Sequence, residues 1–172
     1  DLECPSNLPT GRVVMFTKNG DFISELIADP NTVPPEQFHP EFIVLGPDGL
    51  LYVSSSLNPC TGLGGQVFRF DPETLMFKDV FIIDNGGAGQ LNRPAGLVFD
   101  PDGHKLYVLS FRDNGQPNTP GNADAIRIYD ATTGAFQGKI DLWQVVVPPP
   151  TPPAAQPRSF AAGLLFGPEG KL

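Results

Sequence analysis

The sequence contains few of the residues that most often build metal centres and catalytic sites. Among its 172 residues there are two cysteines, two histidines and one tryptophan. Cys4 and Cys60 lack the CxxC spacing of a zinc site. No apolar run approaches the roughly 18 residues that a membrane-spanning helix needs. The G-x-S-x-G motif of serine hydrolases is absent as well. We therefore expect no zinc centre, no membrane span and no nucleophile of that type.

Basic residues are also scarce. Lys and Arg total 11 against 19 Asp and Glu, and the formal net charge is −8. Nucleic acids and anionic membranes would repel such a chain, and the basic residues are too scattered to form a local patch. The charge therefore argues against a nucleic-acid partner and leaves a small molecule or another protein.

The first residues bear on the cellular compartment. The chain opens on Asp1-Leu2-Glu3-Cys4 without an initiator methionine, as a processed protein would. We therefore expect a secreted or periplasmic protein in which Cys4 and Cys60 form a disulfide, with free thiols as the alternative.

Turn residues are abundant, with 19 glycines and 20 prolines, and two kinds of hairpin alternate along the chain. The first kind, GRVVMFTKNGDFISELI at 11–27, has an Asn-Gly turn and returns from Gly65 and from Asp124. The second kind, EFIVLGPDGLLYVSS at 41–55, has a Pro-Asp-Gly turn and returns from Pro94 and from Ala161. No stretch shows the 3.6-residue period of an amphipathic helix.

Together one hairpin of each kind makes a four-stranded unit, whose strands are lettered a to d in chain order. Repeated units of this size without helices predict an all-β fold, a β-propeller of four-stranded blades of which the chain covers about three. The expected parts are an N-terminal extension at 1–10, a half blade at 11–27, blades at 41–83 and 94–142, and the start of another blade at 161–172. A propeller closes its ring to remove exposed strand edges. We therefore expect the remaining blades of a six- or seven-bladed ring to come from the same longer protein or from another chain.

These motifs resemble NHL-type six-bladed propellers. GPDGLLYVSS with QVFRFD, and RPAGLVFDPDGHKLYVLSF with IRIYDATTGAF, are similar in particular to the secreted bacterial variety. The gluconolactonase, strictosidine-synthase and virginiamycin B lyase groups are more distant relatives of that fold. One propeller serves many activities, so the resemblance implies the blade and leaves the function open.

The resemblance also implies where a metal would sit. In gluconolactonase-like propellers a divalent metal in the central channel is held by Glu, Asn and Asp side chains. The matching positions here hold Ala95 in place of Asn and Ser110 in place of Asp, and the preceding blade holds Glu41 and Ser55. A virginiamycin-type lyase would need His and Glu near the channel, which His39 and Glu41 would supply.

The connections between strands differ in length. All a–b and c–d turns are short, whereas the b–c and d–a connections are long and are expected on one face of the disc. These long connections are 28–40, 56–65, 84–93, 112–123 and 144–160. Because long loops on a rigid scaffold commonly carry function, this face is the expected binding face.

Several residues on that face are candidates for binding. Glu41 is a candidate metal ligand or acid/base, or a solvated carboxylate at the rim. His39 would be a ligand or a proton carrier, or would pack in its loop. Arg93 and Arg158 flank the starts of two a strands, where they would bind an anionic ligand as forked donors or pair with neighbouring loop groups.

The loop that contains Arg112 and Asp113 is rich in the oxygen ligands that Ca²⁺ takes, but it lacks the ordered spacing of a calcium loop. A turn-rich loop is the alternative. Ser54, Ser55 and Ser110 lie at the ends of b strands, where serines commonly hydrogen-bond loop backbone.

Two functions follow from these residues. The leading interpretation is a secreted propeller that binds a ligand or a protein partner through the long b–c and d–a loops. The alternative is a metal-dependent hydrolase, lactonase-like, or a lyase acting at the central channel with Glu41 and a divalent metal such as Ca²⁺.

Overall fold

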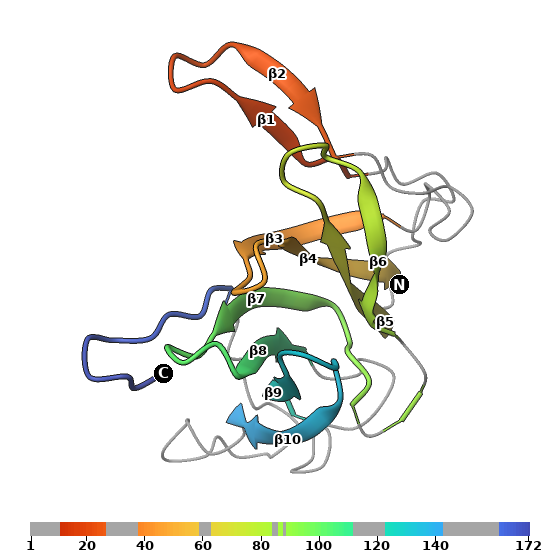
Figure 1. Cartoon of the computed structure of the whole chain (residues 1–172). Helices are drawn as coiled ribbons and strands as arrows, with labels where there is room; N and C mark the ends of the chain where they lie inside the picture. Colours follow the sequence, from red (N-terminus) through yellow and green to blue (C-terminus); the bar gives the residue numbers. More distant parts are fainter. Residues whose placement is uncertain are drawn as a thin grey trace, which may run out of the picture.

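A computed structural model describes residues 11–26, 38–58, 63–83, 86–87, 89–111, 123–142 and 162–172. Ten strands within these ranges form three antiparallel sheets, and the ranges contain no α-helix (Figure 1). The strands are β1 (Val14–Phe16), β2 (Phe22–Glu25), β3 (His39–Leu45), β4 (Leu51–Asn58), β5 (Leu63–Phe70), β6 (Phe77–Ile82), β7 (Pro94–Phe99), β8 (Lys105–Ser110), β9 (Ala125–Asp130) and β10 (Phe136–Asp141). The expected all-β class is confirmed.

In the two larger sheets the spatial order of the strands is their order along the chain. One sheet runs β3-β4-β5-β6 and the other β7-β8-β9-β10, so each is an a–b–c–d unit. Glycine closes the a–b turn of each: Gly49 and Gly103 have φ of 80° and 70°, where other residues are strained. Their N–H groups donate to Gly46 and Asp100, respectively. This arrangement is consistent with two blades of a partial β-propeller.

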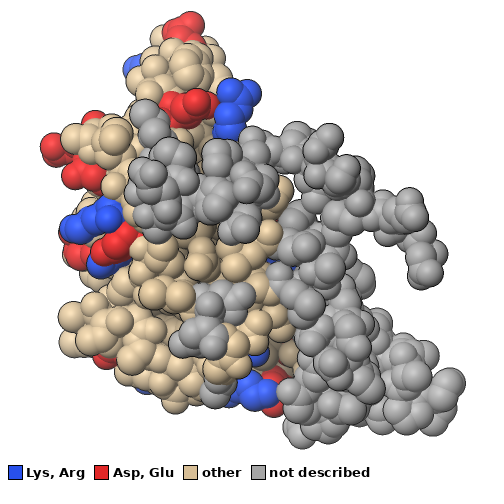
Figure 2. All heavy atoms as spheres, turned by 90° about the vertical axis from the view of Figure 1, so that its right-hand side faces the viewer, with Lys and Arg blue, Asp and Glu red and all other residues tan. Residues whose placement is uncertain are grey.

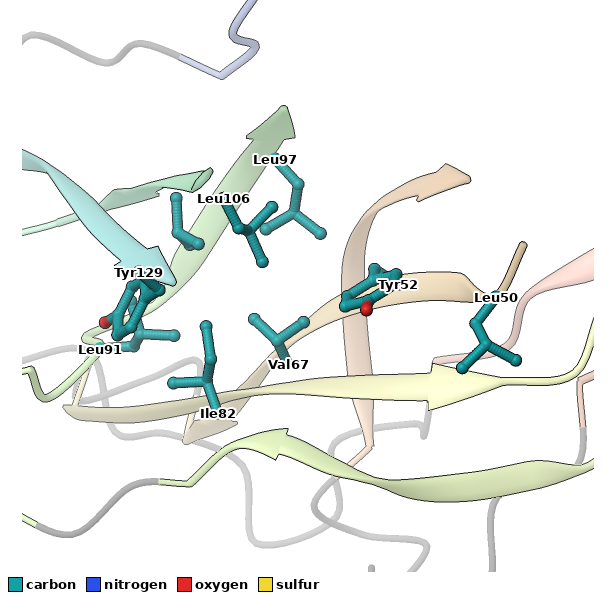
Figure 3. Close-up of a cluster of buried hydrophobic side chains, with 9 residues drawn as sticks. Leu50, Tyr52, Val67, Ile82, Leu91, Leu97, Leu106 and Tyr129 are labelled. Atoms are coloured by element: carbon teal, nitrogen blue, oxygen red, sulfur yellow. The ribbon is translucent and has the colours of Figure 1, made fainter. Parts of the chain in front are cut away.

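The two four-stranded sheets pack face to face through an apolar core. Tyr52, Val67 and Ile82 of the first sheet meet Leu97, Leu106 and Tyr129 of the second (Figure 3). Because side chains alternate along a strand, the neighbouring residues of the first sheet point to its other face. There Val53, Phe68 and Phe70 pack with Phe38, Leu26 and Leu75. The central strands of the first sheet, β4 and β5, are therefore covered on both faces.

The β1–β2 hairpin continues this stack. In Figure 1 it lies beyond the first sheet, on the side away from the second. Leu26 at its end is buried in the core of the first sheet, and Val13 packs against that core. The hairpin is therefore held where the outer two strands of a neighbouring blade would lie.

Close contacts of glycine and proline join successive units. A Cβ added to Gly65, at the start of a c strand, would overlap Pro94 Cδ at the start of the next a strand. Gly11 is related to Pro40 in the same way. Only a residue without a side chain lets the two backbones approach this closely.

The C-terminal segment lies against the second sheet without joining it. A Cβ on Gly96 of β7 would come within 2.9 Å of Gly163 Cα, and the Phe166 ring lies 5.3 Å from that of Tyr107. Gly167 and Lys171 are joined by a 2.8 Å hydrogen bond across the expected Pro-Glu-Gly turn. Residues 162–166 were expected to form a strand, but they pair with no described neighbour, because they face β7 across the stack and do not lie at its edge.

At the short-turn end of the first sheet, a charged network joins the a–b turn to the outer strands. Arg69 donates to both carboxylate oxygens of Asp79, at 2.7 and 2.6 Å, and to Asp48 at 3.3 Å. The paired Asp79 raises the pKa of Arg69. Tyr52 also donates to Asp48, and burial raises the pKa of its phenol to about 12. The network fixes the a–b turn onto the rest of its sheet.

The contact between Gly65 and Pro94 should be sensitive to one added methyl group. Gly65→Ala would push β5 away from the start of β7, and we expect a loss of about 1–3 kcal/mol in the free energy of unfolding. Gly163→Ala is the matched control, since a Cβ there has nothing within 4 Å. Urea unfolding of both variants tests this. Equal stabilities would show that the close approach does not matter.

Candidate functional site

The strand register gathers the expected binding residues at one end of the two sheets, here called the long-loop end. In the first sheet His39 pairs with Ser56, and Ser56 with Gly65. In the second, Pro94 pairs with Ser110, and Ser110 with Ala125. The start of strand a, the end of strand b and the start of strand c therefore lie together in each sheet, and the short turns lie at the other end.

Glu41 and Arg93 come together at the long-loop end, although they belong to different sheets. Arg93 Nε lies 4.0 Å from Glu41 Oε1, and the same oxygen accepts a 3.2 Å hydrogen bond from Ser56 Oγ. Glu41 is the extra residue of a β-bulge, because the pairing with β4 shifts between Pro40 and Phe42. Bulges redirect a side chain, and this one places Glu41 beside the neighbouring sheet.

The backbone and the side chain of Arg93 are both held. Its φ of 43° is unusual for a residue with a side chain, and its N–H donates to Gly64 O at 3.3 Å. The guanidinium carbon lies 5.6 Å from the centre of the Phe111 ring, within range of a cation–π interaction. The side chain nevertheless stays 43% exposed. The charged fork is thus oriented and accessible.

A hollow of about 300 Å³ adjoins Glu41 on the side of the β1–β2 hairpin. It is lined by Arg12, Val13, Val14, Pro40, Glu41, Phe42 and Ile43. Glu41 therefore lies between this hollow and Arg93. The Glu41 side chain is about one-third exposed, so its carboxylate can accept a hydrogen bond from a bound molecule.

The serines at the ends of the b strands serve the backbone, as the sequence predicted. Ser54 Oγ donates to Ala95 O at 2.8 Å, and Ser55 Oγ accepts from the His39 N–H at 2.9 Å. Ser110 Oγ accepts from the Asn92 N–H at 2.9 Å. All three serines are buried. They join strands and sheets and offer no exposed nucleophile.

The sequence analysis missed two residues of this region, Asn92 and Phe111. The side chain of Asn92 is buried and accepts a 3.3 Å hydrogen bond from Gly64 N–H, while its carbonyl accepts from Phe111 N–H at 2.8 Å. Asn92 thus links both sheets directly before Arg93. The sequence signal that could have identified Asn92 is the run Asn-Arg-Pro directly before an a strand, because Asn side chains commonly hydrogen-bond nearby backbone in turns.

Arg112, Asp113, Arg158, Cys4 and Cys60 lie outside the described residues, so the expected loop site and the disulfide stay predictions. Within the part of the chain that the structure describes, no three His, Cys, Asp or Glu side chains gather in a way that would hold a metal ion. No helix in that part is long and apolar enough to cross a membrane.

The charged surface matches the scattered pattern of the sequence. In the view of Figure 2, the described Lys and Arg side chains occur in small separate groups beside Asp and Glu.

Comparisons with known proteins add a distant likeness in structure. No protein-family model matches the chain, and a search of curated proteins found no match. Six chains of solved structures are similar, among them a luciferin-regenerating enzyme with 14% sequence identity and a TM-score of 0.48. That likeness covers 80% of this chain and 39% of the enzyme's chain. The activity in the name of that enzyme describes the enzyme itself and is not assigned to this chain.

The sheets and the site together define the class of protein. It is an all-β protein of propeller-like, four-stranded sheets that face one another and bring Glu41 and Arg93 together where they meet.

The structural role assigned to Ser110 can be tested by removing its hydroxyl. Ser110→Ala leaves the buried Asn92 N–H without this acceptor, and we expect a loss of about 1–3 kcal/mol in the free energy of unfolding. Ser24→Ala in β2 is the control, because Ser24 is half-buried and has no side-chain hydrogen bond to a described residue. Urea unfolding measures both, and an unchanged stability of Ser110→Ala would refute the structural role.

Proposed function

We propose that the chain is part of a secreted, NHL-like propeller that binds a small organic acid at the long-loop end. The observation that carries this proposal is Arg93, whose guanidinium is oriented by Phe111 and Glu41 while its side chain stays 43% exposed. Side chains that only support structure are usually buried in their contacts. An oriented and accessible arginine supports a binding role.

The geometry favours a carboxylate ligand. The planar guanidinium carries a fork of N–H donors that matches the two oxygens of a carboxylate. Glu41 faces only Nε, at the long distance of 4.0 Å, so the terminal nitrogens have no described ion-pair partner. A ligand carboxylate on those nitrogens would neutralise the charge of Arg93.

Glu41 adds a requirement for a hydrogen-bond donor on the ligand. One of its oxygens accepts from Ser56, and the carboxylate still borders the hollow beside the β1–β2 hairpin. A hydroxyl or ammonium group next to the ligand's carboxylate would donate to it. The ligand class is therefore a small hydroxy acid or amino acid.

The metal-dependent alternative has less support. Glu41 already takes part in a hydrogen bond and an ion pair. At the positions where the lactonase pattern has metal ligands, the Ala95 carbonyl accepts a hydrogen bond from Ser54, and Ser110 accepts one from the Asn92 N–H. Binding without hydrolysis is therefore the function that this geometry favours.

The ligand class predicts which probes bind. L-Malate and L-glutamate should bind to the chain, whereas the uncharged succinamide should not. Arg93→Ala should weaken binding of both acids roughly thirtyfold, because a charge-assisted hydrogen bond contributes about 2 kcal/mol. Isothermal titration calorimetry measures the affinities.

Lys18→Ala is the matched control, since it also removes one positive charge but lies in the turn of the β1–β2 hairpin. It should leave the affinities unchanged. The proposal is wrong if neither acid binds at millimolar concentration, or if Arg93→Ala binds them as well as the unaltered chain does.

A further inference from the structure

The c strand of the β1–β2 hairpin is paired on one side only. Among the described residues β1 pairs with β2 alone, whereas the other c strands, β5 and β9, each pair with a b strand and a d strand. The sequences GRVVMF at 11–16 and GQVFRF at 65–70 also align, with Gly, Val and Phe shared at the first, third and sixth positions. The hairpin thus has the sequence of a blade's outer half and an unpaired inner edge.

The position of the hairpin matches that of its counterpart. Gly11 lies as close to Pro40 as Gly65 lies to Pro94. The strand β1 therefore has the same position relative to the first sheet that β5 has relative to the second. The pairing of β1 with β2 also shifts register next to Phe16, as that of β5 with β6 does next to Phe70. The unpaired edge is therefore placed where a b strand would fit between β1 and the inner part of the stack.

The surface beside this edge is apolar and exposed. Ile43 and Leu45 of β3 are accessible on the face toward the hairpin, with Leu45 at 60%, whereas the equivalent strand β7 is largely buried against its neighbours. Apolar strands of this kind are normally covered by protein.

The exposed surface continues an interface that already exists. A hollow of about 260 Å³ lies between the hairpin and the first sheet, lined by Val13, Val14, Met15, Leu26, Ile43, Leu51 and Leu75. Leu26 and Leu75 also belong to the buried core between these elements. A strand placed along β1 would extend that core over β3.

We propose that β1, the exposed face of β3 and this hollow form an acceptor for a β-hairpin of the a–b kind. Its chemistry is two apolar strands joined by a Pro-Asp-Gly turn, as in residues 41–56 of this chain. The second strand would add to β1 by antiparallel backbone hydrogen bonds, as β4 adds to β5. Its side chains would fill the hollow and cover Ile43. This proposal is independent of the ligand at Arg93.

The experiment supplies such a hairpin to the whole chain. A second copy of the sequence of residues 41–56 is placed directly before Asp1, so that residues 1–10 connect it to Gly11 as 57–64 connect β4 to Gly65. The tether keeps the local concentration of the hairpin high, which matters because an isolated hairpin is marginally stable. The matched control has prolines at the copied positions of Tyr52 and Ser54, which cannot donate to a sheet.

Hydrogen exchange of the β1 amides is the measurement. With the added hairpin, the β1 N–H groups that do not bond to β2 should exchange at least about tenfold more slowly than in the proline control. Binding of an apolar dye to the exposed face should fall in parallel. Equal exchange rates in the two proteins would overturn the proposal.

A second copy of the chain is the competing occupant. Sedimentation of the unaltered chain tests it together with exchange. If the chain forms dimers in which the β1 amides are already protected, β1 pairs edge to edge with another β1 and the proposal is wrong. If the chain is monomeric with fast-exchanging β1 amides, and the added hairpin slows them, the acceptor is established.

Discussion

The face-to-face stacking of one four-stranded sheet on the next is the constraint on which the rest of the structure depends. It needs a close backbone approach at one end, where Gly65 meets Pro94, and an apolar core along the faces, where Tyr52 meets Leu97 and its neighbours. Neither sheet could bury its apolar residues alone. The fold is therefore stabilised between repeats as much as within them.

The candidate site is a consequence of the same stacking. Glu41 belongs to the first sheet and Arg93 precedes the second, and their contact exists only because the starts of successive a strands lie side by side. Asn92 strengthens this junction by hydrogen bonds to both sheets. Substitutions that loosen the stack should therefore weaken the site without touching its charged groups.

The sequence predicted the regular features and missed the irregular ones. Pro-Asp-Gly turns and the alternation of apolar residues are local signals, so the a–b–c–d sheets were recognisable without coordinates. The bulge at Glu41 and the contact of Arg93 with the Phe111 ring are irregularities within one sheet, and the left-handed backbone of Arg93 is held by Gly64 of the neighbouring sheet. No local pattern encodes them. Glu41 and Arg93 could thus be nominated singly, but their meeting could not be predicted.

The polar residues at the long-loop end fall into two groups, those buried in structural hydrogen bonds and those accessible to a ligand. Three buried serines form hydrogen bonds with backbone groups, namely Ser54, Ser55 and Ser110. The carbonyl of Ala95 accepts the bond from Ser54. A group that holds two sheets together cannot move during a reaction without loosening the core. Arg93 and Glu41 are accessible polar groups in the described part of this end, and they are oriented yet only partly satisfied. Recognition of a ligand by charge and hydrogen bonding is therefore better matched to this junction than nucleophilic catalysis.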